Sequence, residues 1–150
     1  MNVRVLNTGD IEPMRAMLAM FGRAFDATDI YTAEQPDDAY LERLLSGDGF
    51  VAIAALSGEQ VVGGLAAYVL RKFEQARSEM YIYDLAVDER HRRQGVATAL
   101  IRKLQELAAD LGAYVIFVQA DQGDDAAIAL YSKLGAREDV LHFDIAPRRD

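Results

Sequence analysis

The chain has 150 residues, of which 51% are hydrophobic and 27% charged, a composition typical of one globular domain and not of a disordered chain. Its 16 lysines and arginines stand against 24 aspartates and glutamates, and the resulting formal charge of −8 argues against nucleic acid as a partner. There is no cysteine, which excludes disulfides, cysteine-ligated metals and a thiol nucleophile, and two histidines without a spacing motif predict no metal site.

No apolar run reaches the roughly 18 residues that a membrane-spanning helix needs. The first residues also lack the charged-then-apolar layout of a signal peptide. We therefore expect a cytoplasmic protein with no membrane partner. The acidic balance suits a cationic ligand, although it serves solubility equally well.

The N-terminal third is predicted to be mainly helical. A short strand is expected at residues 3–7. Apolar side chains at helical spacing then predict a helix from Asp10 to about Phe25, with Asp10 as its N-cap. A second helix is expected to begin near Pro36 and to end at Gly47.

A meander of three strands is predicted next. Apolar runs place these strands at residues 50–56, 61–70 and 79–87, and the polar residues 57–60 predict a hairpin turn between the first two.

The rest of the chain is predicted to alternate helix and strand. A helix with one apolar stripe is expected at 95–111, with Gly112 as its C-cap, followed by a buried strand at 114–120. A short helix at 124–134 and a last strand at 140–145 complete the order β-α-α-β-β-β-α-β-α-β. This order predicts an α/β (α+β) fold in a single domain, with a mixed sheet, helices on both faces and a parallel pair formed by a right-handed crossover.

The clearest chemical signal lies where the third meander strand leads into the long helix, through Arg92-Arg93-Gln94-Gly95-Val96-Ala97. The start of a helix has unpaired N–H groups and the positive end of the helix dipole, so it is a natural phosphate site. Gly95 lets the backbone approach an anion closely. A plain turn with a solvated basic patch would show the same residues, so that alternative stays open.

Two motifs resemble those of the GNAT acetyltransferase superfamily. Arg92-x-x-Gly95-x-Ala97 is similar to the Gln/Arg-x-x-Gly-x-Gly/Ala signature, which in that family holds the pyrophosphate of acetyl-CoA. Residues 124–135, DDAAIALYSKLG, resemble the Asn-x-x-Ala-Ile-x-Leu-Tyr-x-Lys-x-Gly helix, with Asp124 in place of the usual asparagine. The resemblance implies a GNAT fold, with a mixed central β-sheet of about six to seven strands and helices on both faces, and acetyl-CoA as co-substrate.

Further phrases resemble the aminoglycoside 3-N-acetyltransferases of type I, or gentamicin acetyltransferases. They are Phe73-Glu74-Gln75, residues 81–87, residues 119–125 and His142-Phe143-Asp144. These enzymes acetylate the 3-amino group of the deoxystreptamine ring of gentamicin-type antibiotics and so inactivate them. The resemblance implies the same activity here, with an aminoglycoside as the second substrate. A homodimer is also expected, because GNAT proteins are often dimers.

Asp84 is the first candidate for a catalytic base. An aspartate in an otherwise apolar strand is costly to bury without a partner, and an amine must lose a proton before it attacks a thioester. Asp84 could instead cap a bulge or pair with an arginine. Glu79 is the alternative base, acting through water, or it is simply a solvated charge at the strand end. By resemblance, Tyr131 is the general acid that protonates the departing CoA thiolate; otherwise it is a core tyrosine.

The remaining candidates are binding residues. The expected cofactor-binding set is Leu85, Ala86, Val87, Arg92, Arg93, Gln94, Gly95, Val96, Ala97, Thr98, Asp125 and Tyr131. Tyr81 and Tyr83 are predicted to share one strand face, alternating with Met80, Ile82 and Asp84, and either to line a sugar-binding cleft or to belong to the core. The candidates for holding substrate ammonium groups are Asp84, Asp121, Asp124, Asp125 and Asp144. Taken singly, each of the last four is typical of a cap, a turn or the surface, whereas together they suit a cationic substrate.

The sequence thus predicts direct acetyl transfer in a ternary complex, since no cysteine is present to carry the acetyl group. Two alternatives stay open. The chain could be a GNAT acetyltransferase for a polyamine, a protein or another small amine, or a non-catalytic CoA-binding module.

Overall fold

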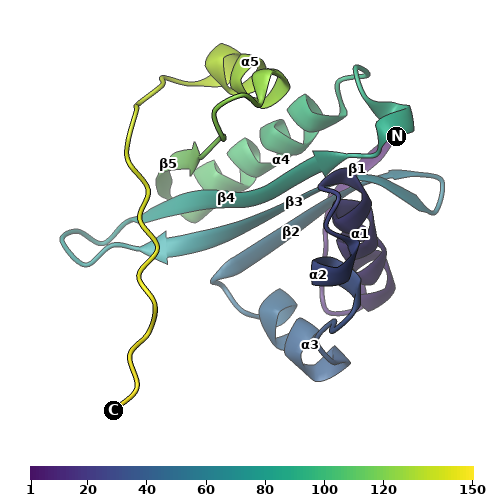
Figure 1. Cartoon of the computed structure of the whole chain (residues 1–150), viewed down its shortest axis with the longest axis horizontal. Helices are drawn as coiled ribbons and strands as arrows, with labels where there is room; N and C mark the ends of the chain where they lie inside the picture. The colour runs from purple at the N-terminus through teal and green to yellow at the C-terminus, as the bar shows by residue number, and fades with distance from the viewer. The chain divides into compact units, whose positions relative to one another are not determined.

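A five-stranded sheet in the order β1-β2-β3-β4-β5 organises residues Met1–Gln119 of the computed structural model, which describes all 150 residues (Figure 1). β1 to β4 are antiparallel neighbours, and β5 runs parallel to β4. The predicted mixed sheet is therefore confirmed, with five strands instead of six to seven. The strands are β1 (Asn2–Val5), β2 (Phe50–Ser57), β3 (Gln60–Arg71), β4 (Ser78–Val87) and β5 (Ala113–Val118).

Five helical segments accompany this sheet, and three of them, α1, α3 and α4, lie where the sequence predicts helices. They are α1 (Ile11–Ala24), α2 (Thr28–Thr32), α3 (Asp38–Ser46), the 3₁₀ turn η1 (Glu89–His91) and α4 (Val96–Leu111). The pattern did not predict α2, because a helix of five residues is too short to show a 3.6-residue period. None of these helices is long and apolar enough to cross a bilayer.

Two neighbouring glycines of β3 show that α1 and α4 cover opposite faces of the sheet. A methyl group at Gly63 would lie 2.7 Å from Cγ1 of Val96 in α4, and one at Gly64 would lie 2.5 Å from Cγ and Sδ of Met17 in α1. Successive strand residues point to opposite faces, so the helices lie on either side. We call these the α4 face and the α1 face. The predicted arrangement with helices on both faces is confirmed.

The core under α1 consists of large apolar side chains at helical spacing. Met14, Met17, Met20 and Phe21 are almost completely buried, together with Leu41 of α3. Burying one such side chain stabilises the fold by about 1.5–3 kcal/mol. This packing fixes α1, and with it the short α2 that follows, on the sheet.

A β-bulge interrupts the pairing of β3 with β4. Asp84 pairs with Ala66 while Ile82 pairs with Ala67, which leaves Tyr83 as an extra residue on β4. Ala66 shares the α1 face because it is two residues from Gly64. Asp84 therefore lies on the α1 face as well, since directly paired residues share a face.

The bulge overturns one prediction. Strict alternation placed Asp84 on the same face as Met80 and Ile82. The structure places Ile82 on the α4 face and Asp84 on the α1 face, together with Tyr81, whose partner is Tyr68 of β3. The extra residue reverses the phase of the strand halfway along it, and no spacing rule in the sequence reveals this.

Two smaller predictions also need correction. Asp10 precedes α1 as predicted, but its side chain does not cap the helix. Its carboxylate instead accepts a hydrogen bond from the N–H of Asn7 at 2.8 Å and pairs with Arg4 at 2.9 Å. The strand β5 is not fully buried as expected, because Tyr114 and Val115 on it are exposed.

Residues Ala120–Asp150 form a second unit, described here by itself. Its one regular element is α5 (Asp125–Leu134), where a helix was predicted. The strand predicted at 140–145 is wrong: the segment has no regular structure, and Leu141 and Phe143 are exposed. Alternating apolar residues form a strand only where a neighbouring strand supplies hydrogen-bond partners, and this unit contains none.

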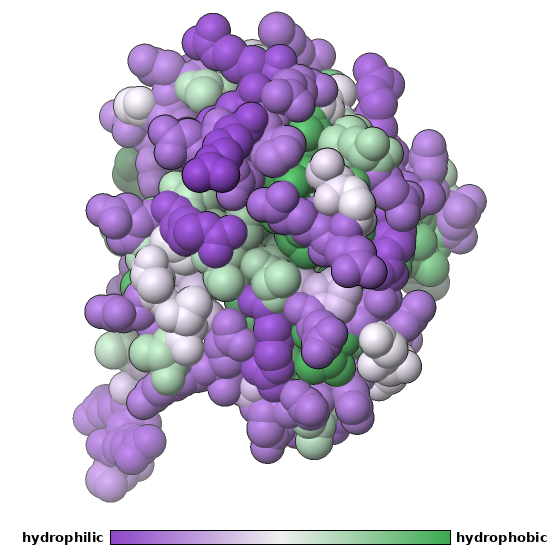
Figure 2. Space-filling view, turned by 90° about the vertical axis from the view of Figure 1, so that its right-hand side faces the viewer, coloured by the Kyte–Doolittle hydropathy of each residue, from purple (hydrophilic) through white to green (hydrophobic).

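Hydrophilic residues cover most of the side of the molecule shown in Figure 2, with hydrophobic residues visible in patches between them. This surface agrees with the 27% of charged residues in the sequence.

Candidate active site

The turn before α4 has the geometry of an anion site. Gly95 is the N-cap of α4 and has a left-handed backbone, with φ 79°, and Arg93 is also left-handed, with φ 61°. No side chain caps the helix. The first N–H groups of α4 are therefore left without a side-chain acceptor and are available to a phosphate.

Cationic side chains surround this turn. Arg90, Arg92 and Arg93 take part in no ion pair, although Nε of Arg92 donates to the carbonyl of Val87 at 3.3 Å. A hollow of about 370 Å³ lies beside the turn, lined by Arg90, Arg92 and Arg23 of α1 together with Asp88 and Glu89, and Arg23 pairs with Asp88 at 3.8 Å. Unpaired arginines next to free helix N–H groups favour the binding of a phosphorylated ligand.

The last residues of β4 have one open edge. β5 pairs with β4 only from Ser78 to Ile82, whereas β3 continues to pair with β4 as far as Val87. The backbone groups of Leu85 and Val87 that do not face β3 thus have no strand partner. An extended ligand could form hydrogen bonds along this edge, as an added strand does.

Asp84 lies between this open edge and α2. The hydroxyl of Tyr31 in α2 donates a hydrogen bond of 3.0 Å to Oδ1 of Asp84. No lysine, arginine or histidine pairs with the carboxylate, so the arginine partner considered from the sequence is absent. Burial raises the pKa of Asp84 above its usual value, and the hydrogen bond from Tyr31 partly opposes that rise.

A row of aromatic rings crosses the α1 face next to Asp84. The row is Phe50, Tyr68, Tyr83, Tyr81 and Phe117, with successive ring centroids 5.3, 5.8, 5.6 and 4.6 Å apart. Tyr81 and Tyr83 therefore lie together, as predicted, and Tyr83 is 63% exposed. Burial, and then the charge of Asp84, raise the pKa of Tyr68, so this ring too lies within the field of the carboxylate.

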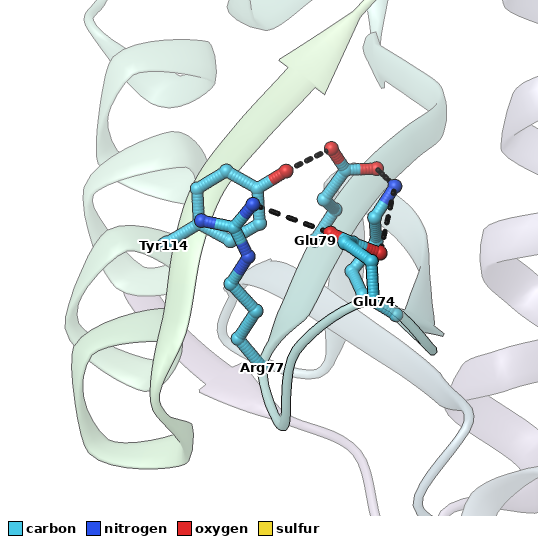
Figure 3. Close-up of polar contacts among 5 residues, drawn as sticks. Glu74, Arg77, Glu79 and Tyr114 are labelled. Carbon is cyan, nitrogen blue, oxygen red and sulfur yellow. Dashed lines mark hydrogen bonds and ion pairs between the residues drawn. The ribbon is translucent and has the colours of Figure 1, made fainter.

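Glu79, at the other end of β4, belongs to a dense polar cluster (Figure 3). The hydroxyl of Tyr114 donates to its Oε1 at 2.5 Å, and Nζ of Lys72 lies 3.8 Å from its Oε2. Arg77 pairs with Glu74 at 3.2 Å, and its guanidinium lies 3.9 Å from the centre of the Tyr114 ring. The hydrogen bond to Glu79 raises the pKa of Tyr114. Both carboxylate oxygens of Glu79 thus have a partner within this cluster.

The second unit carries the remaining predicted residues. Asp124 is the N-cap of α5 and accepts a hydrogen bond from the N–H of Ala127 at 3.2 Å. Asp144 lies 2.8 Å from Nε2 of His142, in the segment without regular structure. Of the predicted site residues in this unit, Asp125 and Tyr131 lie on α5, Asp121 and Asp124 lie in the turn before it, and Asp144 lies in the segment after it.

The structure therefore brings Asp84, Tyr81 and Tyr83 together, and it places Glu79 near the start of β4, where its carboxylate belongs to the separate cluster with Tyr114 and Lys72. It adds Tyr31, Tyr68 and Phe117 to the site. Tyr68 and Phe117 could have been found from the pairing of the predicted strands, because both are direct partners of Tyr81. Nothing in the sequence marks Tyr31. The structure holds no cluster of three or more acidic, histidine or cysteine side chains arranged for a metal ion.

Comparison with known proteins identifies the class of fold and site. The model of the acetyltransferase (GNAT) family matches residues 15–136, across both units. The chain belongs to the GNAT acetyltransferase family.

Individual relatives agree with this family. A crystal structure of an aminoglycoside acetyltransferase from an uncultured soil metagenomic sample is 58% identical, covers 98% of each chain and superimposes with a TM-score of 0.96. Another metagenomic aminoglycoside acetyltransferase, solved in complex with sisomicin, is 31% identical, with a TM-score of 0.89 over 98% of this chain and 96% of that one. N-acetyltransferase 8B of Rattus norvegicus is 33% identical over 65% of this chain, which spans 43% of that relative's length.

Members of this family use acetyl-CoA, and the residues of the turn fit its diphosphate. The uncapped start of α4, the left-handed Gly95 and the unpaired arginines provide donors and positive charge. A methyl group at Gly95 would meet no atom within 4 Å, so open space lies in front of the backbone there.

Proposed function

We propose that this chain transfers the acetyl group of acetyl-CoA to an amino group of an aminoglycoside, the 3-amino group of gentamicin-type antibiotics, and so inactivates them. The observation that carries the proposal is the half-buried carboxylate of Asp84, which has no cationic partner and lies beside a partly exposed row of aromatic rings. Two relatives that are aminoglycoside acetyltransferases support the substrate class.

The electrostatics favour an ammonium group at Asp84. A half-buried carboxylate without a counterion is unfavourable, so a substrate cation that binds there regains the missing ion pair. Aromatic faces attract both cations and the C–H groups of sugar rings, which suits Tyr81 and Tyr83 to an amino sugar. These features favour a polycationic amino sugar as the acetyl acceptor over an acceptor with little positive charge.

The chain's own residues then divide the chemistry. Asp84 accepts the proton of the attacking amine, and its raised pKa suits that role. The N–H groups of α4 and Arg92 bind the diphosphate of acetyl-CoA, which supplies the activated acetyl group. The open edge at Leu85, Ala86 and Val87 orients the extended arm of the co-substrate, and a backbone N–H there stabilises developing negative charge on the thioester oxygen.

Two other roles rest on the family resemblance. Tyr131 is proposed to protonate the leaving sulfur, because an ordinary tyrosine is protonated at neutral pH. Tyr131→Phe should then lower kcat about tenfold or more with little change in KM. The homodimer and the single domain expected from the sequence stay predictions, which sedimentation and unfolding experiments would check.

The decisive experiment is a panel of aminoglycosides with and without a free 3-amino group, assayed with acetyl-CoA by release of free thiol. We expect turnover only where the 3-amino group is free, with the product acetylated at that position. Turnover of sisomicin at a different amino group would contradict the regiochemistry but not the class. Turnover of spermidine alone would show a polyamine acetyltransferase. Binding of CoA without turnover of any amine would show a binding module.

A further inference from the structure

We propose that Tyr31 is a positioning residue for the catalytic base: its hydroxyl holds Oδ1 of Asp84, so that Oδ2 is left facing the amine that gives up its proton. The inference rests on the proposed function, since it requires Asp84 to be that base. Tyr31 lies 53 residues before Asp84 in the sequence, on a helix that the pattern did not predict, and no feature of the sequence joins the two.

The geometry of this contact is that of a fixed donor. Tyr31 Oη lies 3.0 Å from Oδ1 of Asp84, and the bond is partly buried. No other donor of the protein contacts the carboxylate. Hydrogen bonds to a charged acceptor are about twice as strong as neutral ones, and a single donor on one oxygen also fixes the rotation of the carboxyl group.

The ring of Tyr31 packs against two phenylalanine rings of the segment before it. Its centroid lies 6.0 Å from that of Phe21 in an edge-to-face contact and 5.8 Å from that of Phe25. Gly22 of α1 allows this approach, because a methyl group there would lie 3.3 Å from Cβ of Tyr31 and 3.1 Å from Cα of Thr28. The hydroxyl therefore projects from a packed aromatic cluster.

The backbone of Tyr31 is also anchored. Nε2 of Gln35 donates to its carbonyl at 3.1 Å, and Nη1 of Arg15 donates to Oε1 of Gln35 at 2.9 Å. Arg15 lies on α1, so this chain of hydrogen bonds joins α2 to the helix that packs on the sheet. Ring and backbone are thus both constrained, which is the requirement for a residue that orients another.

The groups that face Asp84 are all tyrosines. Tyr31 faces it from α2 and Tyr68 from β3, while Tyr81 and Tyr83 lie beside it on β4, and no cation faces it from any of these elements. Phe21 and Phe25 of α1 supply only apolar surface. Tyr31 is therefore the one neighbour whose hydrogen bond favours the ionised carboxylate, while burial opposes it.

Tyr31→Phe tests this role with little disturbance, because the phenylalanine ring keeps the packing on Phe21 and Phe25. The readout is the titration of the Asp84 carboxyl carbon by NMR in the full chain without substrate, assigned by its loss in Asp84→Asn. We expect the midpoint to rise by about one pH unit, since a lost hydrogen bond to a charged group disfavours ionisation. Tyr40→Phe, which alters a half-exposed tyrosine on α3, is the matched control and should leave the midpoint unchanged.

Kinetics with sisomicin and acetyl-CoA supply the second readout. In Tyr31→Phe the acid limb of kcat/KM should move upward with the NMR midpoint, and KM for acetyl-CoA should stay unchanged. A midpoint that stays in place in Tyr31→Phe overturns the inference even if Asp84→Asn is inactive. Wild-type turnover in Asp84→Asn instead refutes the base assigned under the proposed function, and the inference with it.

Discussion

The two carboxylates of β4 make an instructive comparison, because they share one strand and one face but have opposite surroundings. Glu79 has a tyrosine donor at 2.5 Å and a lysine at 3.8 Å, and a second ion pair lies next to it. Asp84 has one tyrosine donor and no cation. The first arrangement pairs the carboxylate with a cation of the protein, whereas the second leaves the carboxylate without one and open to a cationic ligand. Residue type alone does not distinguish Asp84 from Glu79 as the candidate base, because both are carboxylates of β4 and only their partners differ.

The largest expected effect is on turnover. Asp84→Asn should lower kcat by about 10²–10⁴-fold, because the amide cannot accept the proton of the amine. Glu79→Gln should stay within a few-fold of the wild type, since its partners already occupy its oxygens. Steady-state kinetics with an aminoglycoside and acetyl-CoA measure both. Equal losses in the two variants would mean that both ends of β4 take part in catalysis.

A smaller effect of opposite sign is expected on stability. The pKa of Asp84 is raised in the folded chain above its ordinary value of 3.8, so its ionisation becomes unfavourable for folding as the pH rises through the folded pKa. Asp84→Asn should therefore raise Tm at neutral pH, and the difference should vanish at acidic pH, below the ordinary pKa. Glu79→Gln should lower Tm by removing a hydrogen-bonded charge, at about 1 kcal/mol. Thermal unfolding over a pH series checks both signs, and a lower Tm for Asp84→Asn at neutral pH would contradict the contrast.

Displacing the hydroxyl of Tyr31 should have an intermediate effect on turnover, because it disturbs Asp84 and leaves Glu79 unchanged. In Gly22→Ala the new methyl group must push Thr28 and Tyr31 by a few tenths of an ångström, because it would lie 3.1 Å from Cα of Thr28. We expect kcat/KM to fall a few-fold at the acid limb, less than in Tyr31→Phe. The alanine also favours the helix by about 0.8–1 kcal/mol, so Tm is not expected to fall. Gly49→Ala, where no atom lies within 4 Å, is the control.

The smallest effects are expected at the Glu79 end. Tyr114→Phe should lower the stability only slightly, since exposed polar contacts contribute little. Added salt should weaken the Lys72 and Arg77 pairs further, because the Debye length is about 10 Å at 0.1 M. Denaturant unfolding at two salt concentrations measures this, and turnover should not change. A large loss of kcat in Tyr114→Phe would show that this cluster supports the site.

Much of the framework follows from the sequence. The strands β2 to β4, the helices α1, α3, α4 and α5, and the glycine turn before α4 were all predicted, because apolar periodicity and glycine placement are local properties. The free N–H groups after Gly95 were predictable for the same reason, because every helix start has them whatever the rest of the fold.

Three of the failures are non-local. The face of Asp84 depends on a bulge, which is set by pairing with Ala66 and Ala67 and not by the residues of β4 alone. The strand expected at 140–145 depends on a partner strand. Tyr31 reaches Asp84 only because α1 and α2 pack on the sheet, so a sequence pattern had no means of revealing it.

The bare backbone at Gly63 has a consequence for the turn that precedes α4. The first residue of that helix, Val96, packs against the bare backbone of Gly63, and a methyl group at Gly63 would lie only 2.7 Å from its Cγ1. The position of the turn before α4 thus depends on the absence of a side chain at Gly63 of β3. A chain that kept every residue from Arg92 to Ala97 but carried a side chain at position 63 would hold this turn farther from the sheet.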